Sequence, residues 1–436
     1  MNYSRKEIMP GVALTCLRSD KFKTACMSIS LLTQLKRETA AMNALIPYVL
    51  RRGTTMYPDM ESLSRKLDNM YGTTIGPAIR RCGEIQIIGF YASFPEGAFL
   101  PAGEDVLQDT AMLMGQLLLS PVTRGGLLRP DYVESEREKM CNTIRSRIND
   151  KRSYALFRCI EEMCCYEDYA VSRFGSAEDC ENIHYTKLTR HYRTLLQQSP
   201  VEIFYCGRAD AAHVARVMRD ALSAMPRGEI DYDIGTDVRM NTVEDKPRYV
   251  EEALNVTQGK LCMGFRLGDI MEDPDEASIL VFNGVFGSGS TSKLFTNVRE
   301  KLQLCYYAGS TADTHKGLLL VSSGIEFDKF EEVKAEILAQ LDEIRKGNVS
   351  DDELNSAKAG LASVLRSAMD CQASLENFYL SQTVAGLDYG PSELAELIEE
   401  VKLEDVVKVA NSIECDMVYF LTGNGDAEDG EEDAED

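Results

Sequence analysis

Hydrophobic residues recur along the chain with two different spacings. In segments such as 62–71 and 293–302, apolar residues stand three or four positions apart, which is typical of one face of an α-helix. Runs rich in Ile, Leu and Val, such as 85–91 and 318–323, are typical of β-strands. The same reasoning predicts further helices at about 38–52, 103–119, 131–149, 151–166, 185–197, 209–224, 274–286, 328–346, 351–369, 371–386 and 403–413, and further strands at 12–18, 22–32, 201–205, 259–267 and 417–421. Strands 12–18 and 22–32 are expected to pair antiparallel around Ser19 and Asp20.

The pattern repeats once over a long distance. Residues 62–94 are expected to form a helix, a glycine-containing turn and a hairpin, and residues 292–326 follow the same order. The two blocks start about 230 residues apart, just over half of the chain. A shared order of helix and strand patterns at this distance indicates an internal duplication.

Each half therefore combines a sheet with many helices, without regular alternation of strand and helix. That arrangement predicts an α+β fold of two homologous halves, each a mostly antiparallel sheet with helices packed on it. The expected halves are residues 1–225 and 248–424. Residues 226–247 contain glycines, several Asp residues and few periodic apolar positions, so they are the expected linker. Residues 425–436 are expected to be an acidic, disordered tail.

Composition narrows the class of protein. The 436 residues are 44% hydrophobic and 27% charged, as in a soluble globular protein. No apolar run reaches the 18 residues that a membrane-spanning helix needs. The apolar patch at 12–17 is too short for the core of a signal peptide, so a cytoplasmic location is expected, without membrane association. The net charge of −23 repels phosphate backbones, so nucleic-acid binding is not expected.

Cysteine and histidine usage offers little catalytic chemistry. The 13 cysteines are scattered through apolar segments, which favours core thiols in a reducing compartment over a disulfide framework. A thiol-dependent enzyme that uses Cys164 or Cys165 is the least favoured of the functional classes considered, because no base lies close to these cysteines in the sequence. No two of the four histidines are three or four residues apart. His184 and His191 are seven apart and could share a helical face, but we expect them to be polar surface residues.

Two segments resemble the insulinase/pitrilysin (inverzincin) metallopeptidases. A helix that ends Val49-Leu50-Arg51-Arg52-Gly53-Thr54 is followed by a helix and a hairpin, as in that family. In the second half, residues 292–306 resemble a family signature in which an Arg is followed seven residues later by a Tyr. The likeness covers nearly the whole chain except the acidic tail, and it implies that the two halves face each other across a chamber.

The resemblance fails at the metal site. Active members carry H-x-x-E-H before the Gly-Thr pair, because histidines four apart on one helical face can hold one zinc ion while the Glu acts as general base. Here Ala44 and Tyr48 stand at the histidine positions, Pro47 at that of the base, and Thr143 near that of the later carboxylate ligand. We therefore expect this chain to bind no zinc or other cofactor. Inside a helix, Pro47 also removes a backbone hydrogen bond and is expected to kink the segment, at a cost of about 3 kcal/mol.

The second signature is intact. The resemblance implies that Arg299 and Tyr306 contact the substrate's backbone carbonyl and help to hold the developing oxyanion. It also implies that Gly287, Ser288 and Gly289 border the substrate cleft. Those glycines precede no Lys-Ser/Thr at the spacing of a phosphate-binding loop, so nucleotide binding is not expected.

The resemblance implies the non-zinc subunit of a two-subunit peptidase. Such a chain is inactive alone and supplies Arg299 and Tyr306 to a zinc-bearing partner that cleaves peptides. The alternative is a non-catalytic, peptide-binding or scaffold protein with the same fold that associates with itself.

Overall fold

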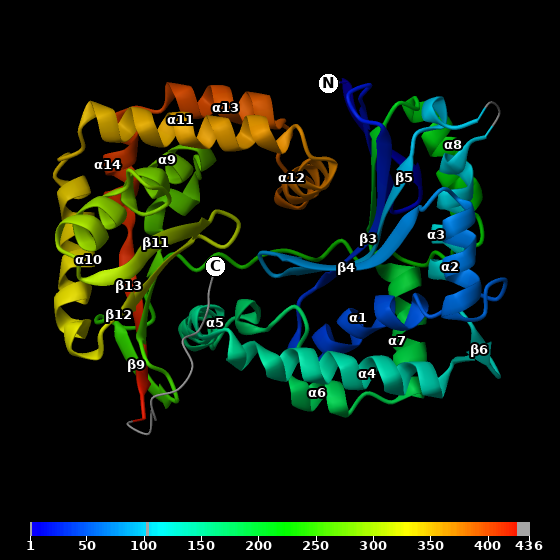
Figure 1. Cartoon of the computed structure of the whole chain (residues 1–436), viewed down its shortest axis with the longest axis horizontal. Helices are drawn as coiled ribbons and strands as arrows, with labels where there is room; N and C mark the ends of the chain where they lie inside the picture. The colour runs from blue at the N-terminus through cyan, green and yellow to red at the C-terminus, as the bar shows by residue number, and fades with distance from the viewer. Residues whose placement is uncertain (1, 102–103, 425–436) are drawn as a thin grey trace. The chain divides into compact units, whose positions relative to one another are not determined.

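The computed structural model of the chain describes residues 2–101 and 104–424, and the expected acidic tail 425–436 lies outside them. The chain folds into two compact units (Figure 1). Unit 1 comprises residues 2–145, 171–236 and 368–388, and unit 2 comprises residues 146–170, 237–367 and 389–424. The units do not coincide with the continuous halves expected from the sequence, because each unit includes a segment from the other half.

Unit 1 is built on a six-stranded sheet with the order β1-β2-β8-β3-β5-β4. All neighbouring strands are antiparallel except β2 and β8, which run parallel. The strands are β1 Asn2–Met9, β2 Val12–Arg18, β3 Thr24–Gln34, β4 Thr74–Cys82, β5 Ile85–Pro95 and β8 Val201–Gly207.

Unit 2 has a five-stranded sheet with the order β11-β12-β10-β13-β9. Its pairs are antiparallel except β13 and β9, which are parallel. The strands are β9 Arg248–Leu254, β10 Gly259–Arg266, β11 Cys305–Asp313, β12 Leu318–Ile325 and β13 Glu414–Gly423. Taken in the order β4-β5-β3-β8-β2, the strands of unit 1 form three antiparallel pairs followed by one parallel pair, as do β11-β12-β10-β13-β9 in unit 2. The α+β fold of two similar, mostly antiparallel sheets is confirmed, and the repeated blocks are the edge hairpins β4–β5 and β11–β12.

The predicted helices are present with boundaries shifted by a few residues. The α-helices are α1 Arg37–Leu50, α2 Met60–Asn69, α3 Val106–Leu119, α4 Pro130–Arg145, α5 Lys151–Met163, α6 Ala177–Glu181, α7 Tyr185–Gln198, α8 Ala211–Leu222, α9 Glu276–Phe286, α10 Phe330–Arg345, α11 Asp351–Ala368, α12 Gln372–Ala385, α13 Pro391–Glu400 and α14 Leu403–Ser412. Short elements are η1 Gly97–Phe99, η2 Ser146–Asn149, η3 Asp168–Ala170, η4 Gly268–Glu272, η6 Phe327–Lys329 and the small hairpin β6 Thr123–Arg124 and β7 Leu127–Leu128.

Three expectations differ from the structure. Strands β2 and β3 do not form a hairpin, because β8 lies between them and pairs with both. The helix expected at 293–302 is a π-helix, η5 Leu294–Lys301. The edge strands β1 and β9 lack the hydrophobic run that predicts a strand: β1 is mostly exposed and carries three consecutive charged residues, and β9 alternates half-buried and exposed positions.

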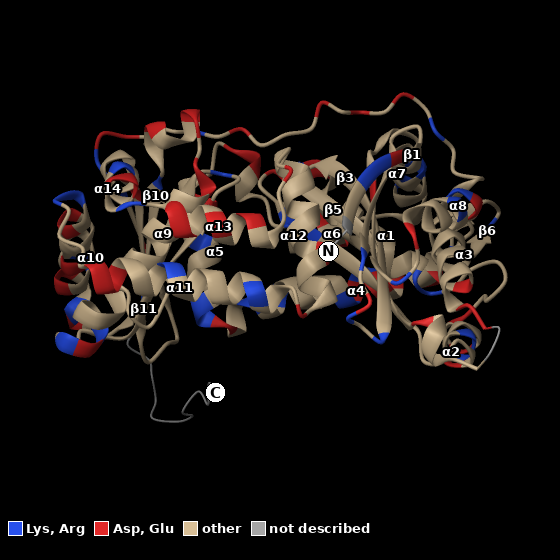
Figure 2. Cartoon of the chain, turned by 90° about the horizontal axis from the view of Figure 1, so that it is seen from above, with Lys and Arg blue, Asp and Glu red and all other residues tan. Residues whose placement is uncertain are grey.

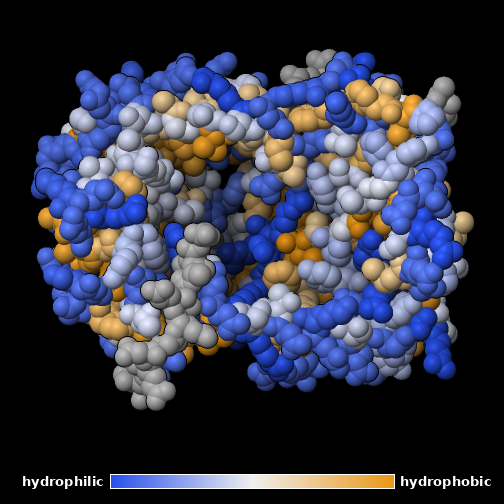
Figure 3. Space-filling view, viewed as in Figure 1, coloured by the Kyte–Doolittle hydropathy of each residue, from blue (hydrophilic) through white to orange (hydrophobic). Residues whose placement is uncertain are grey.

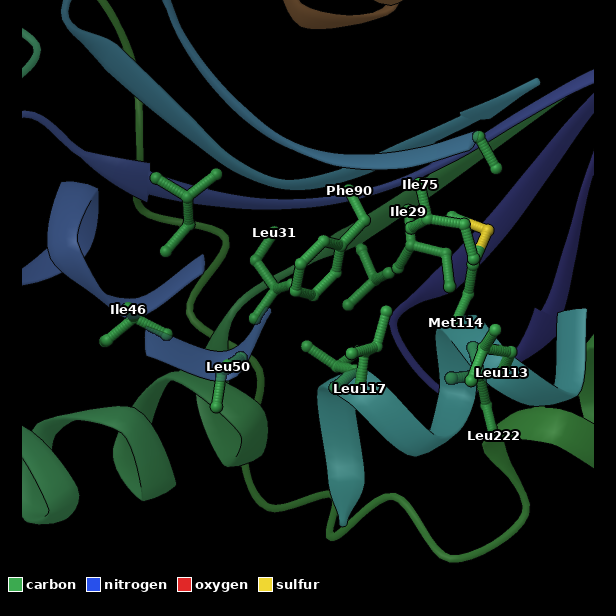
Figure 4. Close-up of a cluster of buried hydrophobic side chains, with 14 of the residues drawn as sticks. Ile29, Leu31, Ile46, Leu50, Ile75, Phe90, Leu113, Met114, Leu117 and Leu222 are labelled. Carbon is green, nitrogen blue, oxygen red and sulfur yellow. The ribbon is translucent and has the colours of Figure 1, made fainter. Parts of the chain in front are cut away.

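The core of unit 1 lies between its sheet and the helices on one face. Figure 4 shows Ile29, Leu31, Ile75 and Phe90 from the strands facing side chains of α1, α3 and α8. Gly115 of α3 allows close packing on α8, since a Cβ there would stand 2.4 Å from the carbonyl oxygen of Ala221.

The face of the molecule shown in Figure 3 is largely hydrophilic at its periphery. Helices α10 and α11 carry both acidic and basic residues (Figure 2). No helix in the described part of the chain combines the length and hydrophobicity needed to cross a membrane.

One helix from each half of the sequence packs on the sheet that the other half forms. Helix α5 packs on β10 and β13 of unit 2, and α12 packs on β3 and β8 of unit 1. These strand pairs hold equivalent places in the two sheets, so each sheet is covered at the same place by a helix from the other half of the sequence. In Figure 1 the exchange is visible as the green-blue α5 among elements coloured from green to red.

A buried ionic cluster fastens the α5 segment to unit 2. Glu167, just beyond α5, accepts hydrogen bonds from Arg266 Nη2 at 2.6 Å, and its other oxygen lies 2.7 Å from Lys316 Nζ. Arg266 Nε donates to Asp416 at 3.0 Å. Arg266 and Lys316 are completely buried, so each charge depends on its partners for solvation.

Polar contacts also hold α12 in unit 1. Gln372 Nε2 donates to the carbonyl oxygens of Thr24 at 2.9 Å and Cys206 at 3.0 Å, which lie on neighbouring strands. Arg80 of β4 pairs with the buried Glu376 at 2.6 Å. Both exchanged segments are therefore held by buried polar groups as well as by apolar packing.

The substitution Arg266→Ala should lower the free energy of unfolding by about 3–5 kcal/mol, because it leaves two buried carboxylates without their main partner. Urea denaturation followed by circular dichroism measures the change. Arg366→Ala is the matched control: Arg366 is an exposed arginine of α11, paired only with exposed Glu399, and its loss should change stability by less than about 0.5 kcal/mol. A cost for Arg266→Ala as small as that of the control would contradict the assignment.

Candidate functional site

The positions that correspond to a zinc site lie on α1 and α4 of unit 1. Ala44 and Pro47 are buried in α1, and Tyr48 is half-buried beside them. Thr143 on α4 is exposed, and its hydroxyl donates to the carbonyl oxygen of Lys139 at 3.0 Å. Across residues 2–101 and 104–424, no group of three or more His, Cys, Asp or Glu side chains is placed to hold a metal ion.

Helix α1 continues through Pro47 to Leu50. Pro47 lies in the last turn, and its own carbonyl oxygen still accepts a hydrogen bond from the Arg51 N–H at 3.0 Å. The missing proline N–H therefore affects a single bond close to the helix end, where an interruption is least disruptive.

A charged cluster joins α4 to the end of α1. Glu136 of α4 is buried, and one of its oxygens accepts hydrogen bonds from Arg52 and Lys139, each at 2.8 Å. The Arg52 guanidinium lies 4.7 Å from the ring centroid of Tyr132. Burial raises the pKa of Tyr48, and Arg173 and Glu136 act on it in opposite directions. Near neutral pH the Tyr48 phenol therefore stays protonated and cannot act as an anionic ligand.

His191 is not the surface residue that the sequence suggested. Its Nε2 lies 2.5 Å from Asn43 Oδ1, and Asn43 in turn donates to Gln86 at 2.8 Å. Gln86 donates to the carbonyl oxygens of Ala40 and Arg173, so the chain of bonds has one consistent direction and His191 Nε2 carries the proton. Burial lowers the pKa of His191 to about 4. His184 caps the N-terminus of α7 instead, so the two histidines serve separate structural contacts.

Arg299 and Tyr306 flank the start of β11, the edge strand of unit 2. Arg299 lies in the π-helix η5, with its side chain 41% exposed, 3.6 Å from Glu300 and over the ring of Phe295. Burial raises the pKa of the Cys305 thiol, and the charge of Arg299 opposes that effect. Arg299 is therefore within electrostatic reach of the residue that precedes Tyr306.

Tyr306 is exposed, whereas the next residue, Tyr307, packs against another side chain. The strand pairing shifts between Cys305 and Tyr307, so Tyr306 stands at an irregularity of β11 and is 61% exposed. The adjacent Tyr307 lies under the guanidinium of Arg152, 4.1 Å from its ring centroid. Gln303, between η5 and β11, has a φ of +53°, a left-handed conformation that is uncommon outside glycine. A π-helix and an outlier of this kind are often found at functional sites.

The glycine-containing loop meets the same strand. The Gly287 carbonyl oxygen accepts a hydrogen bond from the Ser310 N–H of β11 at 3.1 Å, and a Cβ on Gly287 would stand 2.4 Å from Ser310 Oγ. Ser310 Oγ also lies 2.6 Å from Asn283 Oδ1 of α9. Ser288 and Gly289 are exposed beyond this junction. The structure thus gathers the loop, Arg299 and Tyr306 around one edge strand.

Cys164 and Cys165 have different surroundings. Burial raises the pKa of Cys164 to about 12, so its thiol is protonated and a poor nucleophile near neutral pH. The exposed Cys165 contacts Arg248 at 3.6 Å.

Comparison with known proteins shows clear relatives. Residues 182–361 match the model of the family described as "Peptidase M16 inactive domain". The chain is 31% identical over 415 residues to "Probable inactive metalloprotease YmfF" of Bacillus subtilis, covering 95% of this chain and 96% of that protein. It is 22% identical over 312 residues to "Zinc protease PqqE" of Helicobacter pylori, covering 69% of each chain. A crystal structure of a conserved protein from Enterococcus faecalis superposes with a TM-score of 0.87 at 25% identity, covering 98% of this chain and all of the other.

The depressed pKa of His191 makes stability depend on pH. In the unfolded chain His191 takes up a proton near pH 6.5, whereas in the folded chain it does so only near pH 4. Stability should therefore fall as the pH is lowered from about 6.5 to 4, by up to about 3 kcal/mol from this residue. In His191→Gln, which keeps a donor toward Asn43 and does not titrate, the urea midpoint should fall less over that range.

His213→Gln, in the half-buried first turn of α8, is the control substitution: it leaves His191 and its partners intact, so the urea midpoint should still fall as the pH is lowered from 6.5 to 4. Parallel profiles for the wild type and His191→Gln would show that His191 is not held neutral by the fold.

Proposed function

The chain belongs to the M16 peptidase family, as one of its inactive, metalloprotease-like members, and from that premise we propose that it is the non-zinc subunit of a two-chain M16 peptidase. In this proposal a zinc-bearing partner supplies the metal, the general base and the activated water. This chain supplies Arg299 and Tyr306 to the peptide in the partner's site, so hydrolysis needs both chains.

The observation that carries the proposal is the exposure of Tyr306 beside Arg299. A tyrosine kept for packing would bury its ring, as Tyr419 does on β13 with no exposed surface. Tyr306 instead leaves 61% of its surface exposed at an irregular position of an edge strand. Among the described residues, Arg299 forms an ion pair with Glu300 and a ring contact with Phe295. Surface pairs of this kind contribute little to stability, so the guanidinium remains available for a ligand.

The chemistry of the two groups suits a partner's zinc site. Attack of metal-bound water on a peptide carbonyl places negative charge on the carbonyl oxygen. A guanidinium and a phenolic O–H are donors that stabilise such a charge without being consumed. Neither group can activate water without a metal, which is why the chain alone is expected to be inactive.

The thiols support a further part of the proposal, a cytoplasmic location. No disulfide joins any of the 13 cysteines in the described residues, and most of them are buried. Such a set is typical of proteins made in a reducing environment, so we place the complex in the cytoplasm.

The purified chain should contain no stoichiometric zinc and should not cleave peptides. Metal analysis by mass spectrometry and hydrolysis of a fluorogenic peptide library measure these properties. Chelator-sensitive hydrolysis by the isolated chain would end the proposal.

Co-expression with an M16 chain that carries an intact H-x-x-E-H helix should give a stable complex that hydrolyses peptides. In that complex Arg299→Ala and Tyr306→Phe should each lower kcat by about 100-fold, because each removes a donor to the developing oxyanion. Zinc content and complex formation should be unchanged.

Tyr249→Phe is the matched control, since Tyr249 is a 50% exposed tyrosine on β9, the opposite edge of the same sheet. A homodimer that recruits no zinc-bearing chain, together with wild-type behaviour of Tyr306→Phe, would instead support the self-associating scaffold.

A further inference from the structure

Two buried cysteines of unit 1 lie unusually close together. Cys141 of α4 and Cys180 of α6 place their sulfur atoms 2.9 Å apart. A disulfide bond measures about 2.05 Å, so a movement of less than about 1 Å would bring the sulfurs to bonding distance. The two helices pack against each other, and Arg145 of α4 also pairs with Glu181 of α6.

One of the two cysteines borders a cavity that opens to solvent. Cys141 is 4% exposed and lines this cavity of about 350 Å³ together with five polar residues, whereas Cys180 has no exposed surface. The other lining residues are Arg137, Glu138, Asn142, Arg145 and Glu181. A small, polar reagent can therefore meet the Cys141 sulfur first, with Cys180 placed to react next.

We propose that Cys141 and Cys180 form a reversible disulfide site that takes low-molecular-weight disulfides as its oxidant. The Cys141 thiolate attacks one sulfur of the small disulfide, whose S–S bond breaks and releases one thiol. The Cys180 thiol loses its proton and attacks the Cys141 sulfur of the mixed disulfide, which releases the second thiol. Two protein thiols are oxidised, one small disulfide is reduced, and the two protons leave on the released thiols.

The order of the two steps fits the surroundings of each sulfur. Burial raises the pKa of Cys180, so Cys180 is a poor first nucleophile and a suitable resolving thiol once a mixed disulfide lies 2.9 Å away. Arg137 and Arg145 oppose that rise and favour the anion that the second step requires.

The Cys141–Cys180 disulfide would link α6 covalently to α4, the helix that carries Thr143. A cross-link between residues 141 and 180 closes a loop of about 40 residues, which restricts the unfolded chain and stabilises the folded one. The chain offers an internal comparison in Cys26 and Cys206, which lie directly opposite each other on β3 and β8 and are completely buried. Because no exposed surface lets an oxidant reach Cys26 or Cys206, that pair should stay reduced although the two residues are neighbours.

The test treats the native, full-length chain with oxidised glutathione, quenches it by alkylation and maps its peptides by mass spectrometry. We expect a Cys141–Cys180 linked peptide with the loss of two hydrogens, reversal by dithiothreitol, and a melting temperature several degrees higher in the oxidised form. Cys180→Ser should retain a glutathione adduct on Cys141, and Cys141→Ser should lose both the link and the adduct.

Exposed Cys165 and Cys371 serve as the positive control for the oxidant, since they should acquire glutathione in every sample. Modification of these two residues without a Cys141–Cys180 link in the wild-type chain would overturn the proposal. Formation of the Cys26–Cys206 link at the same rate would also overturn it, because proximity alone would then account for the reaction.

Discussion

The structure of unit 2 depends on one buried set of charges. Arg266 and Lys316 are removed from water, and they are tolerable there only because Glu167 and Asp416 pair with them. Glu167 belongs to the first half of the sequence and the other three to the second. The ionic cluster therefore specifies that the α5 segment completes the second sheet, and the Arg80–Glu376 pair does the same for α12 in unit 1. Apolar packing alone would give less directional control over which helix covers which sheet.

This exchange explains how a duplicated fold can divide its tasks. In unit 1, the contact between α1 and α4 is occupied by Glu136, Arg52 and Lys139, with protein cations balancing the one buried carboxylate. In unit 2, the edge strand β11 carries the exposed Tyr306, and the π-helix before it carries the partly exposed Arg299, with the left-handed Gln303 between them. A buried carboxylate balanced by two protein cations suits a structural role. An exposed phenol and a partly exposed guanidinium suit contact with a ligand.

The chemistry-bearing residues predicted from the sequence are found in two groups. Ala44, Pro47, Tyr48 and Thr143 lie on α1 and α4, and Arg299, Tyr306 and Gly287 lie on or next to β11. No pattern in the sequence predicted the His191–Asn43–Gln86 hydrogen bonds or the Cys141–Cys180 contact. Their partners are 148, 43 and 39 residues apart, and no local spacing rule reports contacts over such distances.

The sequence by itself determined the type and approximate limits of most helices and strands, the duplication, and the lack of zinc ligands on α1. These features depend on local periodicity or on the identity of single residues, and both can be recognised along the chain. Only the tertiary structure decided that β8 separates β2 from β3, that α5 and α12 change units, and that residues 294–301 form a π-helix. The physical reason is that strand order, helix placement and helix winding are set by long-range packing and buried polar pairing, which link residues that are distant in sequence.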